Sequence, residues 1–318
     1  MRAQSASPPI IEPTPDALDR AAAILRAGGL VGLPTETVYG LAADAANPAA
    51  IVALFGAKGR PRFNPLIAHV LDAEAAQRHA VFGSLARRLA SAFWPGPLTI
   101  VAPKRAESPI HDLVTAGLAT VALRAPAHPV ARAMLAAFGG PIAAPSANRS
   151  GHVSPTTAGH VAEEFGGEVA LVLDGGPCAV GLESTVVAVT GDQASLLRLG
   201  GLPRAAIEAV AGPLAASQRQ AAAPASPGML LKHYAPATPV RLNALTPEPG
   251  ETMIGFGAVG GARTLSAAGD LAEAAVNLFA MLRAADLEGA TAIAVAPVPD
   301  HGLGEAINDR LARAAAGR

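Results

Sequence analysis

The stretch LPTETVYGLAADA, from Leu33 to Ala45, follows an apolar run that begins at Leu30 and predicts a buried strand. Two threonines on either side of a glutamate then stand where an ordinary turn would suffice. Threonine is common in strands, so a plain strand edge is the simpler interpretation. The alternative is that the strand carries Thr35 and Thr37 to an open edge of the sheet, where their hydroxyl groups bind a small polar ligand.

Strand and helix patterns alternate around this stretch, up to about residue 212. Apolar runs with the length of strands lie between the helical segments, and some of them follow one another directly. The sequence therefore predicts an α/β fold with a mixed sheet. Helical patterns cover Asp16–Ala27, Pro48–Phe55, Ser84–Phe93, the segment after Pro129, and TTAGHVAEEF, which we expect Ser154 and Pro155 to cap.

The pattern changes at Pro213, where periodicity is lost until Pro236. We therefore expect a first domain at residues 1–212, a linker at 213–236, and a small C-terminal α/β domain at 237–318. In that last part the sequence predicts strands near Thr252–Ile254 and Ile293–Val295, and helices at Leu271–Arg283 and Glu305–Ala316.

Composition excludes several classes of protein. The 318 residues carry a formal net charge of −1 and a pI of about 6.7, so no overall field attracts nucleic acid or a membrane surface. The single cysteine, Cys178, cannot form an internal disulfide or a thiolate metal cluster. We see neither a signal peptide nor an apolar run that approaches the roughly 20 residues of a spanning helix, and we expect a cytoplasmic protein.

A local cluster of basic residues stands in GAKGRPRFNP. Lys58, Arg60 and Arg62 lie within five residues, with no acidic residue between Asp44 and Asp72. A solvated basic loop is one interpretation of this segment. The other is a polyphosphate site, because arginine offers a bidentate fork and lysine a compact charge.

Further polar residues lie beside or within apolar strands. A buried arginine requires an anionic partner, which can come from the protein or from a ligand, and two arginines in one sheet favour a ligand. Ser154, as the first residue of a helix, would also lie where free N–H groups can meet an anion. The residues in such positions are His69, Arg124, Ser146, Asn148, Ser154, Ser184, Thr185 and Arg198.

Six motifs occur in an order that resembles the YrdC-like threonylcarbamoyl-AMP synthases: PTETVYGL, KGRPRFNPL, WPGPLT, VALRAPAHP, PSAN and ESTVV. The resemblance covers roughly Asp16 to Val210. SPGMLLKHYAP and the tail GLGEAINDRLARA are similar to the long, two-domain form of that family. The resemblance implies a YrdC-like twisted mixed sheet flanked by helices, followed by a smaller Rossmann-like α/β domain.

The resemblance also implies an activity, that of a nucleotidyltransferase. Its substrates would be L-threonine, bicarbonate or CO2, and ATP with Mg²⁺, and its products threonylcarbamoyl-AMP and pyrophosphate. The expected partner is a downstream threonylcarbamoyl transferase that modifies tRNA. We expect no membrane partner, weak or absent direct tRNA binding, and no metal ion held by protein ligands alone.

Site residues follow from the motif match. Lys58 and Arg60 would stabilise charge on the phosphoryl oxygens, and Arg124 would pair with the threonine carboxylate. We expect Ser226–Pro236 to form a lid that places Tyr234 against the adenylate. The resemblance assigns Thr37, His69, Arg124, Ala144 and Ser184 to threonine, and Lys58, Arg60, Asn64, Thr120, Ser146, Asn148, Ser154, Arg198 and Tyr234 to ATP.

Three alternatives make different demands on the sequence. A carbamoyltransferase of the hydrogenase-maturation type would need cysteine-rich zinc modules, which Cys178 alone cannot supply. A tRNA-binding or double-stranded RNA-binding module would need a broad basic surface, which a net charge of −1 does not favour. A nucleotide-binding protein without threonine chemistry would turn over ATP whether or not threonine is present.

Overall fold

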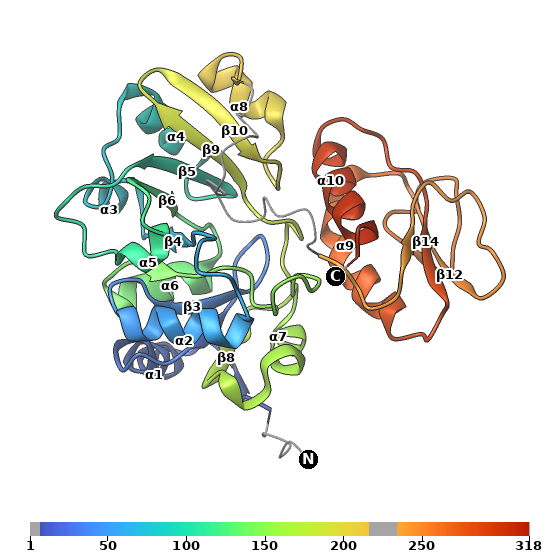
Figure 1. The fold of residues 1–318 in the computed structure, drawn as a ribbon, viewed down its shortest axis with the longest axis horizontal. Helices are drawn as coiled ribbons and strands as arrows, with labels where there is room; N and C mark the ends of the chain where they lie inside the picture. Colours follow the sequence, from blue (N-terminus) through green and yellow to red (C-terminus); the bar gives the residue numbers. More distant parts are fainter. Residues whose placement is uncertain (1–6, 216–233, 318) are drawn as a thin grey trace.

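Two sheets organise the chain. The computed structural model describes residues 7–215 and 234–317, and these form a ten-stranded and a four-stranded sheet. Figure 1 shows the two sheets in separate lobes, the larger one coloured blue to yellow and the smaller one orange to red. The greater part of the expected linker and lid, residues 216–233, lies outside the described residues.

The large sheet is mixed, as the sequence predicts. Its strand order is β1-β8-β2-β3-β7-β4-β6-β5-β9-β10. Parallel pairs such as β4–β6 and β5–β9 alternate with antiparallel pairs such as β2–β3 and β5–β6. The strands are β1 (Ile10–Ile11), β2 (Val31–Leu33), β3 (Gly40–Asp44), β4 (Ile67–His69), β5 (Leu98–Pro103), β6 (Thr120–Arg124), β7 (Ile142–Ala143), β8 (Leu171–Leu173), β9 (Thr185–Thr190) and β10 (Gln193–Arg198).

Helices cover both faces of this sheet. The α2 and α4 helices pack on one face, and α1 and α6 pack together on the other face beside β2, β3 and β7. Leu41 and Ala42, adjacent in β3, belong to these two opposite cores, as the two-residue period of a strand requires. The helices are α1 (Pro15–Arg26), α2 (Pro48–Lys58), α3 (Ala73–Gln77), α4 (Ser84–Phe93), α5 (Asp112–Thr115), α6 (Pro129–Phe138), α7 (Ala158–Phe165) and α8 (Arg204–Ala211).

Two local expectations are wrong: the helix cap at Ser154 and the place of the opening stretch at an open edge of the sheet. The α7 helix begins at Ala158, and its N-cap is Thr157, whose hydroxyl accepts from the backbone N–H of His160. Ser154 is not a cap, because the helix begins four residues after it, and its hydroxyl donates to Oε1 of Glu183. Ser154 therefore offers no helix N-terminus to an anion.

The opening stretch also differs from its expectation. Residues 40–44 form β3, an antiparallel partner of β2, so the Thr-Glu-Thr segment lies in the loop between two strands. Both strands are interior members of the sheet, and neither is at an open edge. Thr35 and Thr37 are buried, at 2% and 1% exposure. The loop therefore contributes to the interior of the protein.

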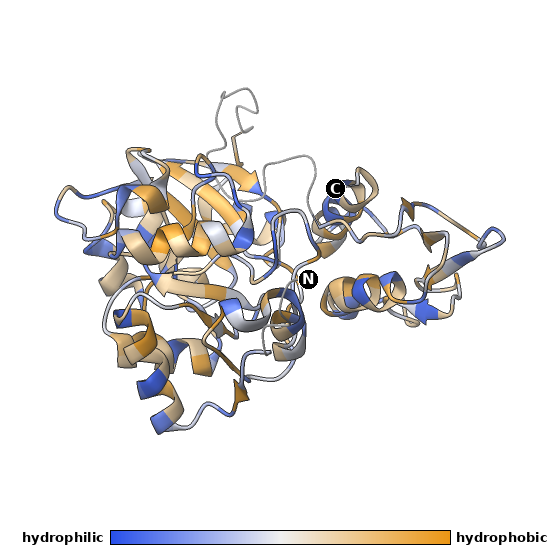
Figure 2. Cartoon of the chain, turned by 60° about the horizontal axis from the view of Figure 1, so that its bottom comes forward, coloured by the Kyte–Doolittle hydropathy of each residue, from blue (hydrophilic) through white to orange (hydrophobic). Residues whose placement is uncertain are grey.

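The C-terminal sheet is parallel throughout, in the order β11-β14-β12-β13. The two strands and two helices predicted here are confirmed. In Figure 2 the helices carry hydrophobic and hydrophilic residues side by side, as expected where one helix face covers a core. No described helix is both long and apolar enough to cross a membrane. The elements are β11 (Val240–Arg241), β12 (Glu251–Gly255), β13 (Arg263–Thr264), β14 (Ala292–Val295), α9 (Leu271–Asp286) and α10 (Leu303–Ala315).

The two lobes share an apolar core. Val38 and Leu182 from the first lobe belong to the same buried cluster as Phe279 of α9. Gly181 has φ +75°, and a Cβ placed there would lie 2.3 Å from the carbonyl oxygen of Ala275. Only glycine allows this close approach, so the contact between the lobes is tight.

Candidate functional site

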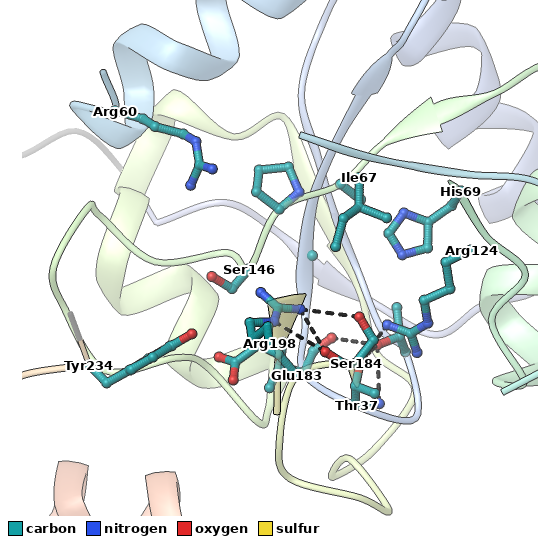
Figure 3. Close-up of a pocket in the computed structure, with 15 residues that line it drawn as sticks. Thr37, Arg60, Ile67, His69, Arg124, Ser146, Glu183, Ser184, Arg198 and Tyr234 are labelled. Atoms are coloured by element: carbon teal, nitrogen blue, oxygen red, sulfur yellow. Dashed lines mark hydrogen bonds between the residues drawn. The ribbon is translucent and has the colours of Figure 1, made fainter. Parts of the chain in front are cut away.

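A pocket opens on the face of the large sheet that carries α1 and α6. Those helices cover one end of this face, and the pocket lies over β4, β6 and β7 beyond them. Figure 3 shows side chains from several strands and loops converging on it. The lining residues are Thr35, Thr37, Val38, Gly40, Arg60, Ile67, His69, Arg124, Ala144, Pro145, Ser146, Glu183, Ser184, Arg198 and Tyr234.

The loop between β2 and β3 fixes Arg124. The Nη1 of Arg124 donates to the Thr37 hydroxyl at 2.7 Å, and Nη2 lies 2.6 Å from Oε1 of Glu36. Thr35 supports this arrangement through a 2.8 Å hydroxyl contact with Thr37. Burial would raise the pKa of Glu36, but the Arg124 guanidinium outweighs it and lowers that pKa. Glu36 therefore orients Arg124.

His69 presents a neutral imidazole. It pairs in register with Arg124 across β4 and β6, and both side chains point to the pocket face. Burial, reinforced by the charge of Arg124, lowers the pKa of His69 to about 3. Its Nδ1 is buried and has no hydrogen-bond partner among the described residues. A ligand group in the pocket can supply that partner.

Ser184 and Arg198 form the opposite wall. The Arg198 Nη2 donates to the carbonyl oxygen of Ser184 at 2.9 Å and to its hydroxyl at 3.2 Å. A second hydroxyl, from Thr99, lies 2.8 Å from that of Ser184. The β9–β10 pairing has an irregular register between Leu196 and Arg198, and this irregularity directs the guanidinium inward.

Two of the three cations in this segment, Lys58 and Arg60, are buried, so the solvated interpretation is wrong for them. Arg60 lines the pocket, and its guanidinium donates to the carbonyl oxygens of Asn64 and Pro65 at 3.2 and 2.8 Å. Burial, with the nearby charge of Arg198, lowers the pKa of Arg60 to about 10. Arg62 is exposed.

Lys58 binds main-chain oxygen atoms in this structure, and its expected contact with phosphate stays a prediction. It does not line the pocket. Its Nζ donates to the carbonyl oxygen of Ser146 at 2.6 Å and to that of Asn148. Burial and the charge of Arg60 lower its pKa well below the usual value for lysine. In this structure Lys58 holds the loop that presents Ser146.

Most of the residues assigned from the motifs come together. All five assigned to threonine line the pocket, as do Arg60, Ser146, Arg198 and Tyr234. Five do not line it: Lys58, Asn64, Thr120, Asn148 and Ser154.

Two kinds of position account for three of these five. Asn64 and Asn148 are buried next to the pocket, each with an Oδ1 that has no partner among the described residues. Thr120 begins β6, about 13 Å along the strand from Arg124 but on the same face. A contact between Thr120 and ATP stays a prediction.

Glu183 is a lining residue that the sequence reasoning missed. It directly precedes Ser184 in the ESTVV motif, and this position in a matched motif is the sequence signal that points to it. Thr35, which the motif match assigns to neither threonine nor ATP, lines the pocket too.

Tyr234 closes one side of the pocket. It is 1% exposed and adopts a left-handed backbone conformation, φ +63°. Its ring stacks on Phe279 of α9, with the ring centroids 5.5 Å apart. The C-terminal lobe therefore supports a wall of the pocket.

The lining holds three arginines and one glutamate, together with several hydroxyl groups and an unpaired imidazole nitrogen. Such a lining suits an anionic ligand that also carries a small polar group. The fold and the site thus define a two-domain α/β protein with a buried anion-binding pocket.

Comparison with known proteins identifies the family. Residues 23–200 match a family model described as Telomere recombination, of the Sua5, YciO and YrdC type. Residues 202–316 match the C-terminal domain of threonylcarbamoyl-AMP synthase. The chain belongs to the threonylcarbamoyl-AMP synthase family, in its two-domain form.

The similarity extends over nearly the whole chain. The threonylcarbamoyl-AMP synthase of Bacillus subtilis is 41% identical over 94% of this chain and 93% of its own length. That of Schizosaccharomyces pombe is 34% identical over 95% and 89%. The crystal structure of Pyrococcus abyssi Sua5 complexed with L-threonine matches with a TM-score of 0.86 and 38% identity, covering 94% of both chains.

Proposed function

We propose that this protein is a threonylcarbamoyl-AMP synthase, which makes threonylcarbamoyl-adenylate and pyrophosphate from L-threonine, bicarbonate or CO2, and ATP. One observation carries the proposal. A single pocket unites the hydroxyl-rich group around Arg124 with Arg60 and Arg198, two buried cations suited to phosphate. The relative solved with L-threonine supports the amino-acid half of the proposal.

Threonine would occupy the side of the pocket next to Arg124. We assign its carboxylate to the Arg124 guanidinium, which Glu36 and Thr37 already hold in one orientation. The neutral His69 ring and the Ser184 hydroxyl offer hydrogen bonds to the amine and the side-chain hydroxyl. Because His69 stays uncharged, it does not repel an ammonium group, and its Nδ1, which has no partner among the described residues, can accept a hydrogen bond from that group.

ATP would occupy the side next to Arg60 and Arg198. Cations placed against the phosphoryl oxygens stabilise the charge that develops there during transfer. Ser146 adds a hydroxyl on the loop that Lys58 holds in place. We propose that Mg²⁺ arrives as part of the Mg·ATP substrate and is held mainly by phosphates and water. The described residues contain no group of three or more His, Cys, Asp or Glu side chains arranged for a metal ion.

The reaction needs no covalent enzyme intermediate. The threonine nitrogen attacks the carbon of CO2, or of bicarbonate with loss of water, and loses a proton to give a carbamate. A carbamate oxygen then attacks the α-phosphorus of ATP. The bond from that phosphorus to the bridging oxygen breaks, and pyrophosphate leaves with the electron pair. The product is a mixed anhydride, which we propose is passed to a downstream threonylcarbamoyl transferase for tRNA modification.

Threonine-dependent pyrophosphate release tests this function. We expect purified protein with Mg·ATP and bicarbonate to release pyrophosphate only when L-threonine is added. Pyrophosphate or phosphate release at an equal rate without threonine would favour a nucleotide-binding protein of another kind.

A further inference from the structure

Arg310 is the largest side chain among those that are fully buried in the described part of the chain, and its exposure is 0%. It lies on α10 of the C-terminal lobe, within the tail GLGEAINDRLARA, and the proposed reaction does not by itself explain why it is there. A guanidinium removed from water requires several charged or polar partners, so its contacts show what it serves.

Those contacts reach the catalytic pocket. The Nε of Arg310 donates to Oε2 of Glu183 at 2.9 Å, and Nη2 donates to the carbonyl oxygen of Leu199 at 2.8 Å. Nη1 donates to Asp309, its neighbour on the helix, at 2.6 Å. The guanidinium carbon also lies 4.9 Å from the centre of the Tyr234 ring. One side chain of the C-terminal lobe thus contacts two pocket-lining residues.

Glu183 is the residue for which this contact matters most. It is a carboxylate in the wall of a pocket that would receive a polyphosphate, next to the arginine expected to bind it, as Figure 3 shows. Its Oε1 accepts from the Ser154 hydroxyl at 2.6 Å, and its Oε2 accepts from Arg310. Burial would raise the pKa of Glu183, but Arg310 first and Arg198 second lower it, so the group is ionised.

We propose that Arg310 is a positioning residue of the ATP site, supplied by the C-terminal lobe. By neutralising Glu183 and binding its Oε2, while Ser154 binds Oε1, it keeps Glu183 from competing with ATP phosphates for Arg198. The inference rests on the proposed function and gives the C-terminal lobe a task in it.

A substitution at this position should separate the two substrates. In the described part of the chain, Arg310 makes no hydrogen bond or ion pair with Thr37, His69 or Arg124. We therefore expect R310Q to raise the KM for ATP and the Kd for a non-hydrolysable ATP analogue by roughly 5–150-fold, with the KM for threonine within about twofold of wild type. R313Q is the matched control. Arg313 is one turn further along the helix, also binds Asp309, and should leave both KM values unchanged.

A second variant tests the route through Glu183 and is informative even if R310Q alone does not fold. In an E183Q background there is no carboxylate to neutralise, so adding R310Q should change ATP affinity by less than about twofold. Circular dichroism and thermal melting would establish that each variant compared is folded.

Three results would overturn the proposal: folded R310Q with both KM values unchanged, both values raised equally, or the same loss of ATP affinity with and without E183Q. A wild-type protein that binds the ATP analogue but releases no pyrophosphate with threonine would instead contradict the proposed function. In that case the analogue binding of the variants still decides the role of Arg310.

Discussion

The guanidinium of Arg124 is paired with the carboxylate of Glu36, and their nearest atoms, Nη2 and Oε1, are 2.6 Å apart. Both side chains are buried, so each compensates the charge of the other. E36Q should leave Arg124 uncompensated and lower the free energy of unfolding by about 3–5 kcal/mol. The KM for threonine should rise, because Arg124 loses its fixed orientation. Urea titration and steady-state kinetics check this, with exposed E107Q as the control; unchanged stability in E36Q would contradict the pairing.

Substrate selectivity follows from the hydroxyl groups in the pocket. Thr37 and Ser184 line the pocket, and both can bind the hydroxyl that threonine and serine share. Threonine differs from serine by one methyl group, so we expect its kcat/KM to be roughly 10–200-fold higher than that of serine. Valine, which has no hydroxyl, should be a poor substrate, because polar groups of the pocket would remain unpaired. Equal turnover of threonine and valine would be inconsistent with this assignment of the pocket.

The basic loop offers a comparison of three cations. R60A should raise the barrier for pyrophosphate release by about 1.5–3 kcal/mol, through loss of a charge-assisted phosphate contact. K58A should also slow the reaction, because the Ser146 loop loses its support. Arg62 is exposed in the same loop, and R62A should have little effect. The mechanism fails if R60A and K58A both release pyrophosphate at the wild-type rate.

His69 gives the protein a pH-dependent stability. Its pKa is about 3 in the folded state against 6.5 for an unperturbed histidine, so between these values the unfolded chain binds a proton that the folded chain does not. The ionisation of His69 therefore leaves the free energy of unfolding unchanged above about pH 6.5. Below that pH the free energy of unfolding falls, by up to about 1.4 kcal/mol per pH unit. H69Q should show a shallower fall than wild type between pH 6.5 and 4 in denaturant unfolding. Parallel curves would show that His69 is not buried in its neutral form.

Hydrophobic period predicts the fold class because it is a local property of the chain, and the resemblance of the ordered motifs to a known family predicts most of the pocket. The sequence does not predict that residues 40–44 pair with β2, since the short run GLAAD lacks the β-branched and aromatic residues typical of strands. It also misassigns Ser154 as a cap, because the competing partner, Glu183, is 29 residues away. The pairings of Glu36 with Arg124 and of Glu183 with Arg310 likewise join distant segments, and only the folded chain brings them together.

The most direct test of the proposed reaction follows the carbon atom from bicarbonate. Wild-type protein is incubated with Mg·ATP, ¹³C-bicarbonate and each amino acid in turn, and the nucleotide products are identified by mass spectrometry. We expect an adenylate that carries threonine and one ¹³C atom, formed together with an equal amount of pyrophosphate and dependent on threonine. An unlabelled threonyl-adenylate, or ATP turnover that yields no adenylate of threonine, would contradict the proposed reaction.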